Sequence, residues 1–231
     1  MNRFQDRTKV PDFSTLSSLL RVSANYEIPN LRARLLGTIR DAYPDDFEGL
    51  DPSKALGENV FDGPKPHPNA VLNLFVQQKV TSALPMAYYM AVRRGSDSLM
   101  DIRLPTSARL SGQTLRCAIR GLIALREMEL KETHRIVFKV KDAPNRVGCS
   151  STDCPSRGSR GLSDEHQRTF DRITGSAVGG TRVLQVLLAS EFMEDTESKF
   201  CQVCGERMQV AHAEVRKKAW AALPEMFDLK A

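Results

Sequence analysis

The sequence contains few aromatic residues, no long apolar run and no N-terminal leader. Aromatic side chains make up 6% of the 231 residues and are not interleaved with basic ones, so no base-stacking platform for nucleic acid is indicated. No window approaches the roughly 18 apolar residues of a membrane-spanning helix. The N-terminus lacks the apolar segment of a secretory signal. We therefore expect no membrane partner and a reducing compartment, cytoplasmic and/or nuclear.

The motifs of several enzyme classes are also missing. The sequence has no G-x-S-x-G nucleophile elbow, no G-x-x-x-x-G-K-[ST] phosphate loop and no H-E-x-x-H metal motif. Residues 175–180 are rich in glycine, but they follow a predicted helix and not the strand that a nucleotide-binding loop requires. We expect a protein that is not an enzyme, with no catalytic and no cofactor-binding residues.

The positive net charge keeps nucleic acid open as a partner. The formal net charge is +5, but the lysines and arginines are scattered along the sequence. The densest group is Arg216-Lys217-Lys218, which is shorter than the blocks of about five or six like charges typical of nucleic-acid-binding arms. A zinc-dependent nucleic-acid-binding protein, which would use this basic group and the arginines of the loop within residues 142–162, is therefore an alternative.

Apolar residues recur every three or four positions, which predicts a mostly α fold: an irregular array of about seven or eight helices. Asp12 and Ser111 are predicted N-caps. Pro29 suits the first turn of the second helix. The predicted helices lie within residues 12–25, 29–43, 69–81, 84–94, 111–128, 163–173, 183–194 and from the last cysteine pair to 223.

Turn-forming residues divide the sequence into three parts. Residues 12–43 form a predicted helical hairpin, residues 44–68 a linker rich in Pro, Gly and Asp, and residues 69–231 a second helical domain. Residues 96–110 are predicted to be a polar loop. Residues 136–138 are compatible with a helix or with a short strand, because so short an apolar run has no decisive period.

Two features of the later helices are specific enough to test. The helix capped by Ser111 is expected to bury an apolar face of Leu115, Ile119, Leu122, Ile123 and Met128. Leu223-Pro224 is expected to end the last helix, because proline lacks the N–H that continues it. Met226, Phe227 and Leu229 are then expected to fold back as an apolar latch.

Four of the five cysteines form two pairs with the spacing of zinc ligands. Cys149 and Cys154 lie in a segment rich in Gly, Ser and Arg, and Cys201 and Cys204 precede Gly205, which permits the turn of a zinc knuckle. Together they predict a closed, structural zinc site that orders this segment and staples it to the last helix. Four unmetallated thiols are the alternative.

The remaining cysteine and the histidines indicate no further site. Cys117 lies among apolar helix positions and is expected to be a small buried side chain. A Cys–His nucleophile, made of Cys201 or Cys204 with His166 or His212, would make the protein a thiol-dependent enzyme. No feature of the sequence defines the low-pKa environment that such a thiol needs.

Several segments resemble one family, in the same order. Residues 19–32 read LLRVSANYEIPNLR, which resembles the "LLRLSxKYEIxxLR" helical hairpin at the C-terminal end of the BTB/POZ domain in basidiomycete fungal BTB proteins. Tyr43-Pro44 stands where those proteins read FP or YP, and residues 84–89 resemble their "LPxALY" segment. The cysteine pairs and residues 216–229 are similar to a late "C…C" pair, a "CxxC" and a closing "RxxxWxxLPxxFxL".

The resemblance implies the C-terminal part of such a protein. Residues 12–43 correspond to about the last quarter of the BTB domain, and its three-stranded front has no counterpart. The implied function is a non-enzymatic protein–protein interaction module, an adaptor for ubiquitin ligase or transcriptional complexes, with an unidentified protein partner. BTB-type homodimerisation is left open because that front is missing. The expected contact surfaces are the hairpin 12–43 and the helix from Met208 to Ala222.

Overall fold

The protein folds as an array of helices, with no strand among residues 12–47, 61, 64–93, 95–139 and 202–229, which the computed structural model describes. This part contains α1 (Phe13–Asn25), α2 (Pro29–Ala42), α3 (Pro68–Gln77), η1 (Thr81–Ala83), α4 (Leu84–Val92), α5 (Ser96–Met100), η2 (Thr106–Ala108), α6 (Gly112–Lys139) and α10 (Gln202–Met226), where η marks a 3-10 helix. The predicted mostly α fold is confirmed, and the helices predicted within residues 163–173 and 183–194 lie outside the described residues. Among these helices, none combines the length and the apolar character needed to cross a membrane.

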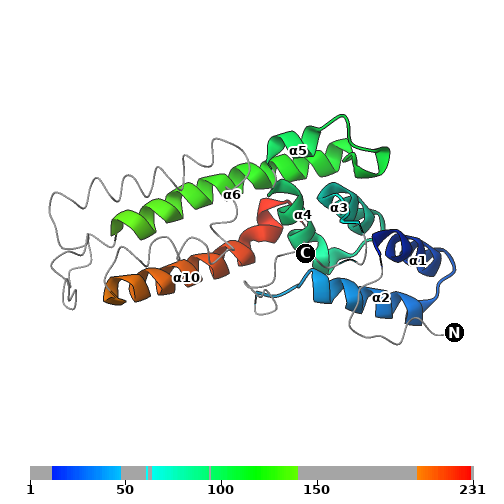
Figure 1. Ribbon diagram of the computed structural model, residues 1–231, viewed down its shortest axis with the longest axis horizontal. Coiled ribbons are helices and arrows are strands. Elements are labelled where there is room, and N and C mark those ends of the chain that lie inside the picture. The colour runs from blue at the N-terminus through cyan, green and yellow to red at the C-terminus, as the bar shows by residue number, and fades with distance from the viewer. Residues whose placement is uncertain (1–11, 48–60, 62–63, 94, 140–201, 230–231) are drawn as a thin grey trace.

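Two long helices extend from a group of shorter ones (Figure 1). α6 and α10 lie side by side and antiparallel. With 28 residues, α6 is about 42 Å long. α1 and α2 pair as a hairpin at the opposite end of the molecule, and α3 and α4 pack between the hairpin and the long helices.

Local sequence explains where the hairpin helices begin. The carboxylate of Asp12 accepts the backbone N–H of Thr15 at 3.0 Å and so caps α1. Pro29 occupies the first position of α2, where no intrahelical N–H bond is required. Leu16 and Leu20, one turn apart on α1, are fully buried. The predicted hairpin and its caps are confirmed.

One hydrophobic core connects the hairpin with the later helices of the described part. Tyr43, the C-cap of α2, packs edge-on against Phe75 of α3 with ring centroids 5.1 Å apart. Tyr88 of α4 stacks on Phe227, just after α10, with centroids 5.0 Å apart. Burial raises the pKa of Tyr43 above its ordinary range and that of Tyr88 to about 12. The core therefore continues across the segment between α2 and α3.

The segment after α10 folds back on the core, as predicted. Phe227 is fully buried, and its ring lies so close to α6 that a Cβ added at Gly121 would come within 2.0 Å of it. Met226 and Leu229 pack partly buried against the same core. The absence of a side chain at Gly121 thus makes room on α6 for the Phe227 ring.

Two helical turns replace the loop predicted for residues 96–110. These are α5 and η2, and α3 fixes both of them through side chains. The amide of Asn73 donates to the backbone carbonyls of Ser107 and Arg109, at 2.9 Å and 2.8 Å. The amide of Asn69 donates to the carbonyl of Ser98 at 3.3 Å. These contacts join distant parts of the chain, so local sequence gives no sign of them.

Other predicted boundaries and faces are also wrong in detail. Pro224 lies inside α10, which runs on to Met226 although proline has no N–H to bond to the preceding turn. α3 ends at Gln77 and not near Thr81. Residues 136–138 are helical. Ile123, predicted to be buried, is 54% exposed on the outer side of α6.

Three helices end in the same hydrogen-bonded cap. Glu27, Lys79 and Asp228 follow α1, α3 and α10 with φ of 50°, 52° and 56°, in the left-handed region that favours glycine. After each of them, the next backbone N–H bonds back to the carbonyl five residues earlier; for α3 the bond joins Val80 to Phe75 at 2.9 Å. This Schellman pattern accounts for all three positive φ angles among the described non-glycine residues.

Candidate interaction site

The predicted zinc ligands fall mostly outside the described residues. Cys149, Cys154 and Cys201 lie outside them, and the side chain of Cys204 is not among those described. Within the described ranges, no three His, Cys, Asp or Glu side chains come together as a metal-binding group. The backbone of Gly205 is inside α10, so the turn expected there is wrong. The zinc site stays a prediction.

The other predicted thiol and histidine positions divide in the same way. Cys117 is 8% exposed and belongs to the core, as predicted. His166 lies outside the described residues, as does the side chain of His212. The Cys–His alternative therefore gains no support from the described geometry.

Charged side chains are buried where α4, α6 and α10 meet. Glu129 and Glu132 of α6 are 3% and 2% exposed. Lys218 of α10 donates to Glu132 with 2.6 Å between the nitrogen and the oxygen. Tyr89 of α4, fully buried, interacts electrostatically with both Glu129 and Arg216. The cluster therefore joins three helices through polar groups inside the core.

The ionisation of this cluster is set by its burial. Loss of water raises the pKa of Glu129 to about 8, and the nearby Arg126 only partly opposes this rise. Burial also lowers the pKa of Arg216. One carboxylate oxygen of Glu129 has no hydrogen-bond partner. Glu129 is thus mostly neutral at pH 7, and at 3% exposure it does not reach a substrate, which indicates a structural role.

The basic group Arg216-Lys217-Lys218 is largely engaged within the protein. The guanidinium of Arg216 lies 5.5 Å from the centre of the Phe47 ring, and the ammonium of Lys217 lies 6.0 Å from it. Lys218 pairs with Glu132. These contacts hold α10 against its neighbours, although Lys217 and Lys218 remain exposed.

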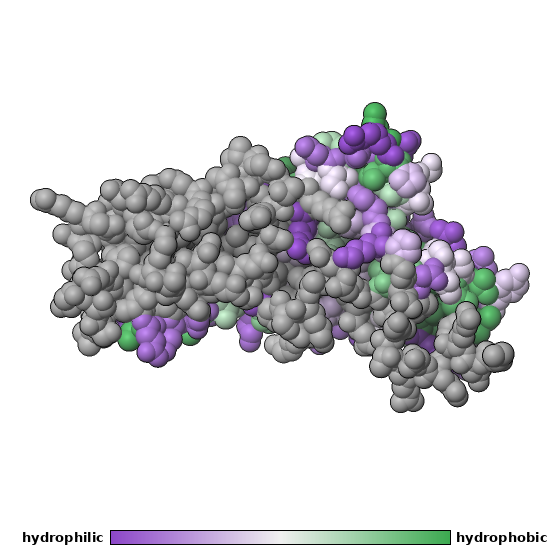
Figure 2. All heavy atoms as spheres, in the orientation of Figure 1, coloured by the Kyte–Doolittle hydropathy of each residue, from purple (hydrophilic) through white to green (hydrophobic). Residues whose placement is uncertain are grey.

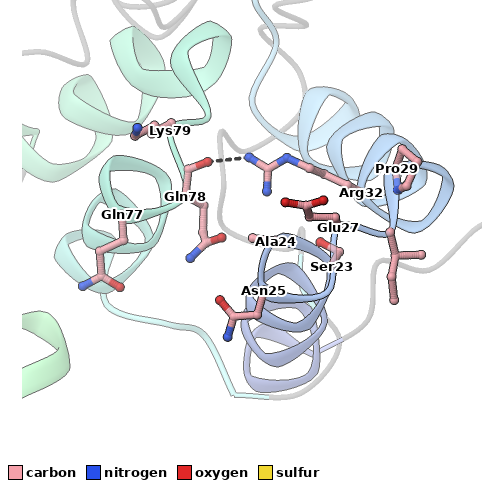
Figure 3. Close-up of a pocket in the computed structure, with 10 residues that line it drawn as sticks. Ser23, Ala24, Asn25, Glu27, Pro29, Arg32, Gln77, Gln78 and Lys79 are labelled. Carbon is pink, nitrogen blue, oxygen red and sulfur yellow. Dashed lines mark hydrogen bonds between the residues drawn. The ribbon is translucent and has the colours of Figure 1, made fainter.

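A hollow of about 660 Å³ opens beside the turn of the hairpin, where α1 and α3 both end (Figure 3). It is lined by residues 23–25, 27–29, 32 and 77–79. The carboxamides of Asn25 and Gln78 and the guanidinium of Arg32 point into the space between these helix ends. Carboxamides donate and accept hydrogen bonds, so the lining can pair with a polypeptide main chain.

Arg32 lies at the floor of this hollow. Its Nη2 donates to the backbone carbonyl of Gln78 at 2.6 Å, which ties α2 to the end of α3. Its Nη1 is buried and has no hydrogen-bond partner. No carboxylate of the described residues pairs with this guanidinium, so one strong donor group remains unused.

Apolar side chains are exposed beside the hollow. Tyr26 is 75% exposed, Val22 is 41% exposed and Ile28 is 38% exposed. Val22 and Tyr26 are four residues apart and share one side of α1, and Ile28 also lines the hollow. Hydrophobic surface is visible over the α1–α2 end of the molecule (Figure 2). We call residues 22–32 and 77–79 the hairpin corner.

Comparison with protein-family models, with curated proteins and with solved structures gave no match. The sequence indicated the hairpin as a contact surface but not the hollow, because residues 77–79 come from a helix some fifty positions further on. At the end of α3, the cap at Lys79 has a positive φ, and the sequence gives no sign of it because the residue is not glycine.

Proposed function

We propose that this protein is a non-enzymatic protein–protein interaction module, and that the hairpin corner is its binding site. The observation that carries the proposal is the exposure of Tyr26, Val22 and Ile28 directly beside a polar hollow. Exposed apolar groups gathered around a hollow are typical of protein-binding surfaces, and tyrosine is enriched at their centres.

The finer assignment rests on the sequence resemblance. An adaptor for ubiquitin ligase or transcriptional complexes, acting in the cytoplasm or nucleus, agrees with a helical surface that binds another chain. Residues 22–32 of the hairpin corner fall within residues 19–32, the segment that resembles the end of a BTB domain. Nucleic-acid binding is less well supported, because Arg216 and Lys218 make contacts within the protein.

A peptide-display selection tests the proposal. The full chain is used as bait for a random peptide library, and the dissociation constants of enriched peptides are measured by fluorescence anisotropy. Tyr26→Ser should weaken binding by about tenfold or more, because truncation of a central aromatic residue removes much of the binding energy. Tyr26 is 75% exposed, so the substitution leaves the core intact.

Val210→Ser is the matched control. Val210 is 62% exposed on α10, whose N-terminal end lies far from the hairpin (Figure 1). Its substitution removes a comparable exposed apolar group and should leave the dissociation constants unchanged. A library that yields no binder, or binders equally sensitive to both substitutions, would contradict the proposed function.

A further inference from the structure

The lining of the hollow contains one buried hydrogen-bond donor that is not used within the protein. Nη1 of Arg32 has no partner. Ser23, Arg32 and Gln78 are the less exposed lining residues, whereas Asn25 and Gln77 are exposed at the rim. Nη1 of Arg32 is buried, so a ligand reaches it only when the exposed side chains around it shift.

The charges around the hollow favour an acidic ligand. Arg32 and Lys79 are cationic, and Glu27 is the one acidic residue of the lining. Arginine without a carboxylate partner is the residue type best suited to bind a carboxylate through paired N–H groups. The volume of about 660 Å³ lies within the range of roughly 300–1,000 Å³ typical of ligand sites.

We propose that the hollow binds an acidic segment of the partner protein, with an Asp or Glu carboxylate accepting a hydrogen bond from Nη1 of Arg32. Lys79 adds a second positive charge at the rim. Tyr26 and Ile28 contact an apolar residue that flanks the carboxylate. This inference rests on the proposed function, because it specifies the partner chemistry of the same site.

The test uses peptides enriched on the full chain in the display selection. Each is synthesised with its Asp or Glu and again with Asn or Gln in that place. The acid form should bind about tenfold more tightly, as expected for a hydrogen bond to a charged group. With Arg32→Gln, the two forms should bind equally. Arg34→Gln, an exposed arginine of α2 that does not line the hollow, should retain the difference.

Glu27→Gln is a second variant for which a gain of affinity is expected, so its result cannot be explained by loss of folding. Removal of this carboxylate lowers the repulsion of an acidic ligand, so the variant should bind the acid peptides more tightly than the parent. A misfolded variant would not gain affinity. Raised salt should weaken the acid peptides more than the amide peptides.

Two failures are distinguishable. Peptides that bind through Tyr26 but show no preference for an acid, or are weakened by Glu27→Gln, would overturn the acidic-segment inference and leave the proposed function intact. If no peptide depends on Tyr26, both the inference and the proposed function are wrong.

Discussion

Glu129 is a buried carboxylic acid in the cluster of charged side chains where α4, α6 and α10 meet. In the unfolded chain its pKa is close to the ordinary 4.5, and in the folded protein it is about 8. The folded state therefore holds a proton that the unfolded state releases. The contribution of Glu129 to the free energy of unfolding is therefore fully present below about pH 4.5 and is lost as the pH rises through about 8.

Glu129→Gln should remove this pH dependence. The amide resembles the neutral acid and does not ionise, so the variant should be more stable than the parent at pH 9 by roughly 2–5 kcal/mol. At pH 5 the two should be nearly equal. Urea unfolding at both pH values measures the difference. Glu127→Gln, on the exposed side of the same helix, is the control, and its stability should change with pH as that of the parent does. If the stability of Glu129→Gln also changes with pH as that of the parent does, the raised pKa of Glu129 is contradicted.

Two glycines inside helices should respond in opposite directions to alanine. Gly121→Ala places a methyl group where the immobile Phe227 ring lies and should cost about 1–3 kcal/mol despite the better helix propensity. A Cβ added at Gly37 in α2 would meet no atom within 4 Å, so Gly37→Ala should raise the free energy of unfolding by about 0.5–1 kcal/mol. Thermal unfolding of both variants decides. If Gly121→Ala were more stable than the parent, the Phe227 ring would not lie against Gly121.

Sequence reasoning succeeded at single residues where the physics is local. Asp12 and Ser111 accept backbone N–H groups three positions later, at 3.0 Å and 3.2 Å, and Pro29 stands at a helix start where no N–H bond is required. Ile123 was misplaced because its helix has a wide apolar surface, and which side is buried depends on where α10 packs.

At the scale of elements, the caps carry strain that glycine would relieve. Lys79 holds a φ of 52° at the end of α3, where a side chain costs free energy. Lys79→Gly should raise the free energy of unfolding by about 0.5–1 kcal/mol. Gln77→Gly, at the last residue of α3, should lower it by a smaller amount, because glycine is a weaker helix former than glutamine. Chemical unfolding measures the change in the free energy of unfolding of each variant. Changes of the same sign would contradict the strained cap at Lys79.

The elements that the sequence missed are held by distant contacts. α5 and η2 are too short to show a period, and amides of α3 fix them. α10 runs through Pro224 because its end packs onto α4 and α6. Helices with long apolar stripes were found, and elements that depend on a tertiary partner were not.

At the scale of the whole molecule, the zinc prediction is open to direct measurement. Purified full-length protein should contain zinc near one equivalent, by elemental analysis. Cys201→Ser should lose the metal together with part of the stability, since a structural zinc site couples binding to folding. Cys117→Ser is the control for loss of a thiol, because Cys117 is a core residue apart from both pairs. Protein that is fully folded without metal would rule the site out.

Only one of the two walls of the candidate site could be predicted from the sequence. The hairpin and its exposed turn follow from residues 12–43, so one wall of the hollow was within reach of the sequence. The other wall, at residues 77–79, is brought there by the packing of α3, and the pairing of Arg32 with Gln78 depends on it. Sites built from two distant segments need the fold before they can be seen.

Hydrogen–deuterium exchange of the full chain, with and without an enriched peptide, tests the hairpin corner most directly. Bound peptide should slow amide exchange in residues 22–32 and in residues 76–80 together, because both walls contact it. Exchange in α10 should not change. Protection confined to α10, or to one wall alone, would contradict the hairpin corner as the binding site of this protein.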